Sequence, residues 1–397
     1  MSWMDNISVE ERRCMEELKR RTLQDLTPAL LADETLFYRF SKARDFVIAD
    51  AEAMLRKHII WREEYNVDSI LIDQPPSEVM LKYVPFHLIG YDKDGNPVLY
   101  IDFGNADIKG IFNSVKSSEM CSYCIYTLQY LLEKCREQTQ KLGKPVTLMN
   151  FIFNFENLTF ASATNKKMLE TLLFFAKMMQ DNYPERIKAI YFLNASFYFS
   201  LAFNVVKHVL ASVVLSKIRC YSPDDDWKGA LLEKIDNEVL PAFLGGTQTD
   251  PDGNPFCKSL IPPARKVPES LYLTNFAKKL SRSKDVRKVT VTRLSKEACT
   301  YEVTEPGSYL EWEFETKNKD IGFAVLFKPA KDSKSSELLP KQRIHTCYEP
   351  EKGLLRCDKS GIYICVFDNS YSWLYSKELY FRIQVTPPRE SEDVNIS

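Results

Sequence analysis

The sequence has few of the residues, and none of the short motifs, that build the commonest catalytic and nucleotide-binding sites. It contains 4 histidines and 13 glycines in 397 residues. The phosphate-binding loops G-x-x-x-x-G-K-[ST] and G-x-G-x-x-G are absent, as are the hydrolase motif G-x-S-x-G and the zinc motif H-E-x-x-H. We therefore expect a protein that is not an enzyme, with no catalytic residues, no cofactor and no metal ion.

The charge balance and the N-terminus bear on the protein's binding partners and on its cellular compartment. The 53 basic and 54 acidic residues give a net charge of −1, which excludes a globally basic nucleic-acid binder. Residues 1–21 carry charges where a signal peptide needs an apolar stretch, so we expect a soluble protein in the cytoplasm. Reduced cysteines follow from that compartment. Cys121 and Cys124 form a lone C-x-x-C without a second pair at zinc spacing.

One segment, residues 192–218 (FLNASFYFSLAFNVVKHVLASVVLSKI), is far more apolar than its surroundings. Asn204, Lys207 and His208 lie at its middle, which argues against a transmembrane helix. As a helix it would carry roughly twice the apolar width of an ordinary surface helix. It must therefore be covered on two sides. It is either a central core helix, or a helix with protein or lipid on one side and a membrane on the other.

Three patterns follow one another along the chain. Residues 5–70 have a helical repeat, and from residue 97 strands alternate with helices, which predicts an α/β unit with a largely parallel sheet. Period-two alternation then predicts an antiparallel β-sandwich, with strands at 288–294, 299–305, 309–316, 321–329, 361–373 and 378–385. We place the domains as follows: helical 1–75, α/β 76–250, connector 251–275, sandwich 276–388 and a disordered tail 389–397.

Phenylalanine, tyrosine and methionine are concentrated in four consecutive elements of the α/β region. These are NFIFNF, LLFFAKMM, IYFL and FYFSLAF. Such side chains either fill a tight core or line a cavity for a hydrophobic ligand, because ligand sites are mostly apolar and methionine adapts to irregular shapes.

Several separated stretches resemble motifs of the CRAL-TRIO lipid-transfer family. Residues 182–210 resemble its Tyr-Pro-Glu turn, strand, corner and apolar helix, with Ser196 in place of the corner proline. Residues 36–64 are similar to its N-terminal helical motif, where Val47 replaces the usual aspartate, and residues 240–261 to its C-terminal closure. The runs TDPDGNP-x-CKS and FDNSYSWLYSKELYF resemble the subfamily with an appended GOLD domain.

The resemblance implies that residues 197–215, hereafter the gate segment, cover a closed lipid cavity and swing away at a membrane. In phosphoinositide-carrying members a glutamate and a lysine surround the headgroup, and here Glu185 and Lys217 hold those positions. The pair either binds a headgroup or forms a salt bridge that latches the gate. Val214 replaces a threonine beside that lysine, and residues 153–157 are more aromatic than in the family. The first departure implies a weaker headgroup site, and the second implies a drier cavity and a different cargo.

We therefore expect a carrier that binds one hydrophobic lipid, such as a tocopherol, a squalene-like isoprenoid, a retinoid or a phospholipid such as phosphatidylinositol. Its expected partners are this ligand, intracellular membranes such as the Golgi or endoplasmic reticulum, which the gate would touch transiently, and a protein bound by the GOLD-like domain. The alternative is a trafficking adaptor regulated by lipid. The expected cavity walls are Phe153, Phe155, Phe174, Phe175, Phe192, Phe199, Phe203, Val206 and Leu210.

Overall fold

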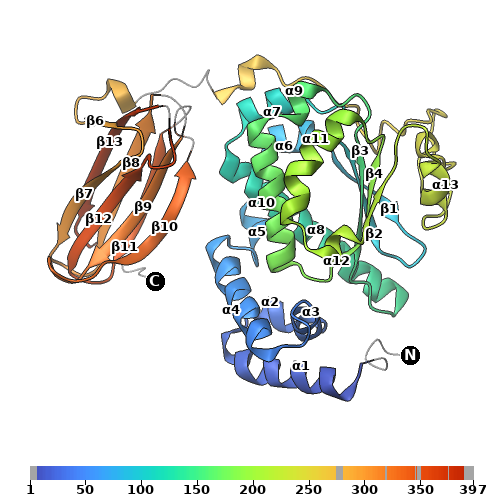
Figure 1. Ribbon diagram of the computed structural model, residues 1–397, viewed down its shortest axis with the longest axis horizontal. Coiled ribbons are helices and arrows are strands. Elements are labelled where there is room, and N and C mark those ends of the chain that lie inside the picture. The colour runs from blue at the N-terminus through green and yellow to red at the C-terminus, as the bar shows by residue number, and fades with distance from the viewer. Residues whose placement is uncertain are drawn as a thin grey trace, which may run out of the picture. The chain divides into compact units, whose positions relative to one another are not determined.

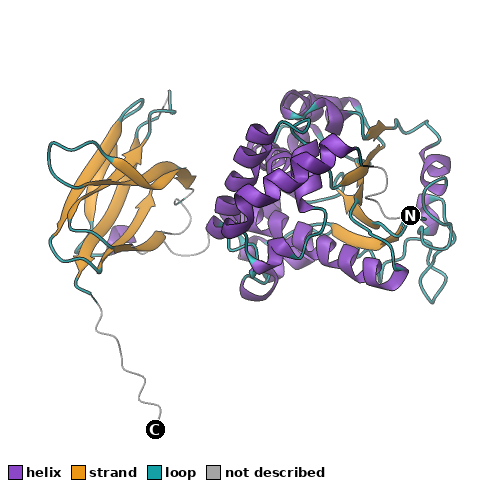
Figure 2. Ribbon diagram, turned by 90° about the horizontal axis from the view of Figure 1, so that it is seen from below, coloured by secondary structure: helices purple, strands orange, loops and turns teal. Residues whose placement is uncertain are grey.

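The computed structural model describes residues 7–273, 280–317, 320–344, 346, 350–373 and 375–388. The chain forms two compact units, Met1–Val115 with Glu119–Glu269, and Lys116–Ser118 with Ser270–Ser397. The first holds the helices and the mixed sheet, and the second holds antiparallel sheets (Figures 1 and 2). The expected domain boundaries stay predictions. The boundary at residue 275 and the tail at 389–397 lie outside the described residues.

The N-terminal part is helical, as the sequence predicted. Ser8 caps the first helix, because its hydroxyl accepts from Glu11 N–H while the Glu11 carboxylate accepts from Ser8 N–H. Leu18, Phe40 and Leu55 are fully buried between the helices. The helices are α1 (Val9–Thr22), α2 (Pro28–Leu31), α3 (Leu36–Lys42), α4 (Ile48–Glu64), α5 (Ile70–Asp73) and α6 (Glu78–Tyr83).

The predicted α/β arrangement is confirmed. A five-stranded sheet has the order β1-β2-β3-β4-β5, in which β1 is antiparallel to β2 and all other pairs are parallel. The strands are β1 (Phe86–Tyr91), β2 (Pro97–Asp102), β3 (Met149–Asn154), β4 (Ile187–Leu193) and β5 (Ile218–Cys220). The sequence pattern missed β1 and β5, which form the two edges of the sheet and lack a long apolar run.

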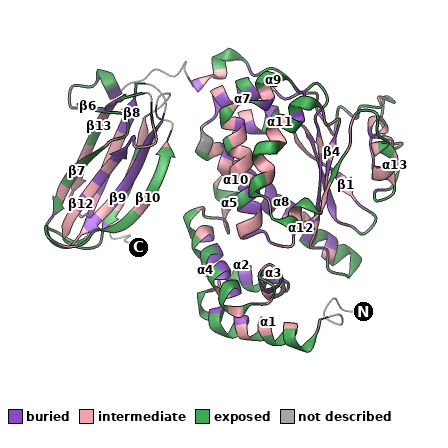
Figure 3. Ribbon diagram, in the orientation of Figure 1, coloured by how far each residue is buried: buried purple, intermediate pink, exposed green. Residues whose placement is uncertain are grey.

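Helices cover both faces of this sheet (Figure 1). One face packs against α8 (Ser117–Leu142) and α10 (Lys166–Asn182), and the strands β2 and β3 between the layers are almost wholly buried (Figure 3). The opposite face packs against α13 (Trp227–Leu232) and residues 235–261. Because β3 is buried on both sides, four of its six residues are apolar, and its two asparagines are buried and hydrogen-bonded.

An ion cluster joins the N-terminal helices to the turn before β4. The Asp33 carboxylate accepts from Arg39 Nη2 and Arg186 Nη2, each at 2.5 Å, and Arg39 Nη1 donates to Pro184 O at 3.1 Å. Burial raises the pKa of Asp33, but the two guanidinium groups outweigh it and hold that pKa well below its usual range. Asp33 therefore stays ionised and fixes the position of the Tyr183–Arg186 turn.

The second unit is a β-sandwich of two antiparallel sheets, ordered β10-β9-β12-β7 and β11-β8-β13-β6. Phe314, Phe323, Phe367 and Phe381 meet in its core, with ring centroids 4.7–5.4 Å apart. The strands are β6 (Arg287–Val291), β7 (Lys296–Val303), β8 (Ser308–Thr316), β9 (Ile321–Lys328), β10 (Ser336–Ile344), β11 (Glu351–Cys357), β12 (Gly361–Asp368) and β13 (Lys377–Thr386).

Six of these strands were predicted, whereas β10 and β11 were missed. Both lie at sheet edges, and β10 is mostly exposed and contains Pro340, so its pattern resembles a loop. In β11, Gly353 pairs with Trp312, and a Cβ at residue 353 would lie 2.1 Å from the indole ring. The glycine thus looks like a turn signal in the sequence, although its role is to make room for a tryptophan.

The buried His58 predicts a pH dependence of stability. His58 Nδ1 lies 3.0 Å from Asn182 Oδ1, and burial lowers the pKa of His58 to about 3, against about 6.5 in an unfolded chain. The folded state therefore favours the neutral ring. The stabilising contribution is complete above pH 6.5 and is lost as the pH falls below that value.

Between pH 6.5 and 5 we expect this ring alone to lower the free energy of unfolding by about 2 kcal/mol. Urea unfolding of wild type and His58→Gln across this range measures it. The variant should show a clearly shallower pH dependence, and equal slopes would contradict the assignment. Asp33 does not interfere, because an unfolded aspartate titrates near pH 4.

Candidate functional site

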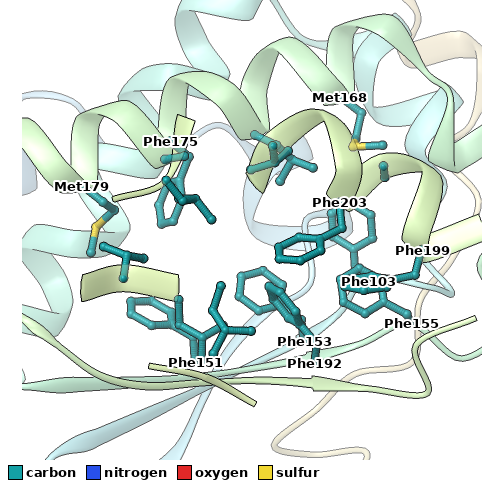
Figure 4. A pocket seen from close by; sticks show the side chains of 18 of the residues that line it. Phe103, Phe151, Phe153, Phe155, Met168, Phe175, Met179, Phe192, Phe199 and Phe203 are labelled. Carbon is teal, nitrogen blue, oxygen red and sulfur yellow. The ribbon is translucent and has the colours of Figure 1, made fainter. Parts of the chain in front are cut away.

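The sheet supplies one wall of an apolar cavity (Figure 4). Phe151 and Phe153 of β3 and Phe155 just beyond it point to one face, because alternate residues of a strand share a face. Phe192 of β4 joins them, with its ring centroid 5.6 Å from those of Phe153 and Phe155. The alternation of β3 thus turns a run of phenylalanines into a flat aromatic wall.

Helix α10 supplies the opposite wall. Met168, Leu172, Phe175, Ala176 and Met179 line the cavity, and their spacing of three and four residues places them on one helical face. Figure 4 shows Met168, Phe175 and Met179 pointing from this helix toward the phenylalanines of the sheet.

The gate segment closes the cavity. Helix α11 (Phe197–Val206) begins at Ser196, whose hydroxyl accepts from Phe199 N–H at 3.5 Å, and it lies beside α10 (Figure 1). Its Phe199 ring lies 4.7 Å from that of Phe155, and its Phe203 ring lies 5.6 Å from that of Phe192. Val206 and Leu210 extend the same lining.

The periodicity of the gate segment predicted one helix, but the structure divides the segment into shorter elements. After α11 it becomes a 3₁₀ turn (Lys207–Val209), Leu210 is extended with φ −85° and ψ 131°, and α12 (Ser212–Leu215) follows. At this break Gln180 of α10 donates to Val209 O at 2.9 Å and accepts from Ala211 N–H at 2.5 Å. One side chain therefore satisfies the two backbone groups on either side of Leu210.

The cavity is almost free of polar groups. Its volume is about 110 Å³, and among the described residues that line it Gln180 is the only one with a polar side chain. A second cavity of about 90 Å³ adjoins it and extends between β2, α7 (Ile108–Ser114) and α8. The two share six wall residues, Phe103, Phe151, Phe153, Met168, Leu172 and Phe175. The apolar walls of both cavities suit an uncharged molecule.

The outer side of the gate segment is also apolar. Large apolar side chains on it remain exposed, to 74% at Phe197 and to 38–48% elsewhere. These others are Tyr198, Val205, Val209, Val213 and Leu215. The segment thus has an apolar inner and an apolar outer flank.

Glu185 and Lys217 lie close to each other but not in the walls of either cavity. Glu185, with φ +55°, places its carboxylate 3.9 Å from Lys217 Nζ and 3.3 Å from Lys42 Nζ of α3. Partial burial lowers the pKa of Lys42, but the Glu185 carboxylate outweighs it and raises that pKa. Glu185 therefore bridges the end of the gate segment and the N-terminal helices.

Eight of the nine expected wall residues line the first cavity, and Phe174 does not. The helical repeat of α10 separates Phe174 from the other wall residues, because Phe174 lies one position away from the helical face that carries Phe175 into the cavity wall. The same repeat and the alternation of β3 would have found Met168, Met179 and Phe151. By contrast, no local sequence pattern indicated that Gln180 contacts the gate segment or that Lys42 pairs with Glu185.

The described residues contain no cluster of three or more His, Cys, Asp or Glu side chains arranged to hold a metal ion. The nine described cysteines are free. Within the same part of the chain, no helix combines the length and the hydrophobicity that a membrane span needs.

Comparisons with known proteins agree with this architecture. Residues 81–246 match the model of the CRAL/TRIO domain. Protein ctg-1 of Caenorhabditis elegans is 25% identical over 376 residues, which is 93% of this chain and 96% of the relative. Protein real-time of Drosophila pseudoobscura pseudoobscura is 29% identical over 238 residues, 60% of this chain but 34% of that longer protein.

Among solved structures, that of Sfh5 aligns with 68% of this chain and 96% of its own, at 15% identity and a TM-score of 0.48. The domain match covers the sheet, α10 and the gate segment, so it includes every wall of the first cavity. The β-sandwich that follows lies outside the matched residues. Residues 81–246 therefore form a CRAL/TRIO domain, the domain of a lipid-binding family.

Proposed function

We propose that this protein carries one uncharged hydrophobic lipid in the cavity beneath the gate segment and transfers it between membranes, without covalent chemistry or a cofactor. The proposal rests on one observation, a cavity walled by apolar side chains and covered by a segment that is apolar on both flanks. Exposing a hydrophobic molecule to water is costly, so cavity and bilayer are both better environments than the solvent between them.

The wall chemistry supports a cargo without a charged headgroup. No acidic or basic side chain stands among the described residues that line either space, and an ion buried there would be costly. A tocopherol, a retinoid or a squalene-like isoprenoid fits this requirement better than phosphatidylinositol. We infer that Glu185 acts with Lys42 and Lys217 as a latch, because the Glu185 carboxylate already pairs with both lysines.

The gate would open by moving α11, and its outer flank would then enter the bilayer. Phe197 and Val213 are exposed in the closed form, so apolar contact with the bilayer can begin before the cargo is uncovered. Gln180 opposes opening, since its two hydrogen bonds to residues 209 and 211 must break.

Native mass spectrometry of the full chain, followed by organic extraction, tests the cargo. We expect one bound lipid per chain with no phosphate group. A protein that is empty, and that takes up neither tocopherol nor squalene nor phosphatidylinositol, would contradict the carrier. A stoichiometric phospholipid would overturn the proposed latch and assign Glu185 and Lys217 to a headgroup site.

Phe203→Asp should lower the cargo retained by at least tenfold, because it places a carboxylate against the rings of Phe192 and Phe199. Uptake of a fluorescent lipid measures the loss. Ser200→Asp is the matched control, since Ser200 is exposed on the same helix. Phe197→Asp should keep its cargo but extract it slowly from vesicles. Normal loading of the Phe203 variant would remove the gate segment from the mechanism.

Gln180→Met should weaken closure, because it removes both hydrogen bonds at the break. At about 1 kcal/mol each, their loss favours opening by roughly thirtyfold. We expect faster release of a fluorescent lipid and faster hydrogen exchange in residues 199–215. Lys177→Met is the control, because Lys177 is one turn earlier on α10 and pairs with Asp181. Unchanged exchange in the Gln180 variant would show that the break needs no such support.

A further inference from the structure

Two loops at one end of the sandwich hold apolar side chains in solvent. The loop between β6 and β7 carries Leu294, which is 52% exposed, and the loop between β12 and β13 carries Trp373 and Tyr375, which are 76% and 54% exposed. The loops are neighbours, because Leu294 N–H donates to Ser372 O at 3.2 Å. We call Leu294, Trp373 and Tyr375 the sandwich tip.

The tip is held in place by a buried asparagine. Asn369 Nδ2 donates to Val291 O at 3.2 Å, Thr292 O at 3.1 Å and Tyr375 O at 2.9 Å. Its own N–H donates to Ser295 O at 2.9 Å. One fully buried side chain therefore ties both loops together, and the exposed apolar residues are presented by a braced framework.

Leu294 also has an unfavourable backbone. Its φ of +59° lies in the left-handed region, where glycine and asparagine are preferred and leucine is strained. Burial of the Leu294 side chain does not offset the free-energy cost of this strain, since more than half of the side chain is exposed. Strain kept at an exposed apolar residue is typical of a functional surface.

The same end of the sandwich has an excess of cations. Asp368, at the end of β12, pairs with Lys296 at 3.0 Å and with Lys341 at 3.3 Å. Asp320, before β9, pairs with Lys377 at 2.8 Å and with Arg343. The register places these strand ends together, because Asp368 lies opposite Lys296 and Gly322. Each buried carboxylate is therefore met by two positive charges.

Arg293 adds a further charge directly beside Leu294, and it is exposed. The next acidic residue along the chain is Glu297, in β7. Five cations thus stand against three carboxylates among the residues just named, and the net charge around the tip is positive. Aromatic and aliphatic side chains beside a net positive charge are the combination that anionic membrane surfaces attract.

We propose that the sandwich tip docks on the interface of a membrane that contains anionic phospholipid. Tryptophan and tyrosine favour the headgroup region, because each joins an apolar ring to a hydrogen-bonding group. Leu294 enters the acyl boundary, and Arg293 with the exposed Lys296 and Lys341 meets the lipid phosphates. This surface belongs to the sandwich alone and is independent of the cargo and of the gate segment.

Cosedimentation of the full chain with phosphatidylcholine vesicles, with and without phosphatidylserine, tests the proposal. Leu294→Asn/Trp373→Ser removes the apolar contacts, and asparagine suits the left-handed backbone, so the sandwich should fold. The matched control is Leu338→Ser/Leu354→Ser, which removes two leucines that are 43% and 48% exposed on β10 and β11. The gate segment is intact in both.

We expect the tip variant to bind phosphatidylserine vesicles at least tenfold more weakly than wild type, with its cargo content unchanged, and the control to bind normally. Arg293→Gln should reduce the preference for phosphatidylserine. Equal binding by wild type and tip variant would overturn the proposal, as would an equal loss in the control. If the wild-type protein binds neither kind of vesicle, the proposal is overturned, and the tip would instead insert into a pocket of a protein partner.

Discussion

The face of β3 and β4 that carries phenylalanine must be kept from water, and the arrangement of α10 and the gate segment follows from this requirement. Burying a phenylalanine contributes about 1.5–3 kcal/mol, so leaving Phe151, Phe153 and Phe192 uncovered would be costly. Helix α10 covers part of this face permanently. The gate segment covers the rest through Phe199 and Phe203, and the cavity is the space that these layers leave between them.

A cover that can be moved needs weaker attachment than the core beneath it. The gate segment meets this condition because it consists of short elements, α11, a 3₁₀ turn and α12, joined at an extended Leu210. Its polar ties are few and local, at Gln180 and at Lys217. Displacing it would leave the hydrogen bonds of the central strands intact, so opening need not unfold the sheet.

Both units expose apolar side chains that their own packing does not explain. In the first unit these lie on the outer flank of the gate segment, and in the second they form the sandwich tip. A single weak membrane contact is easily reversed, whereas two contacts on one chain reinforce each other. The proposed carrier, which would have to find a membrane, load and leave again, would benefit from contacts that are each modest.

The order of the elements can be predicted from the sequence alone, because the hydrophobic period separates helices from strands wherever one face is buried. The aromatic character of the cavity can be predicted as well, since the strand alternation of 151–155 and the helical stripe of 168–179 place known residues on one face. Edge strands such as β10 were not predicted, because exposure on both faces removes the alternation that identifies a strand.

Contacts between groups far apart in the sequence depend on the complete fold. Gln180 reaches the break at Leu210, Lys42 reaches Glu185, and Asn369 ties two loops of the sandwich. A polar side chain has the same local signature whether it faces water or a backbone group far along the chain. Its partner is fixed by packing, and packing is a property of the whole fold.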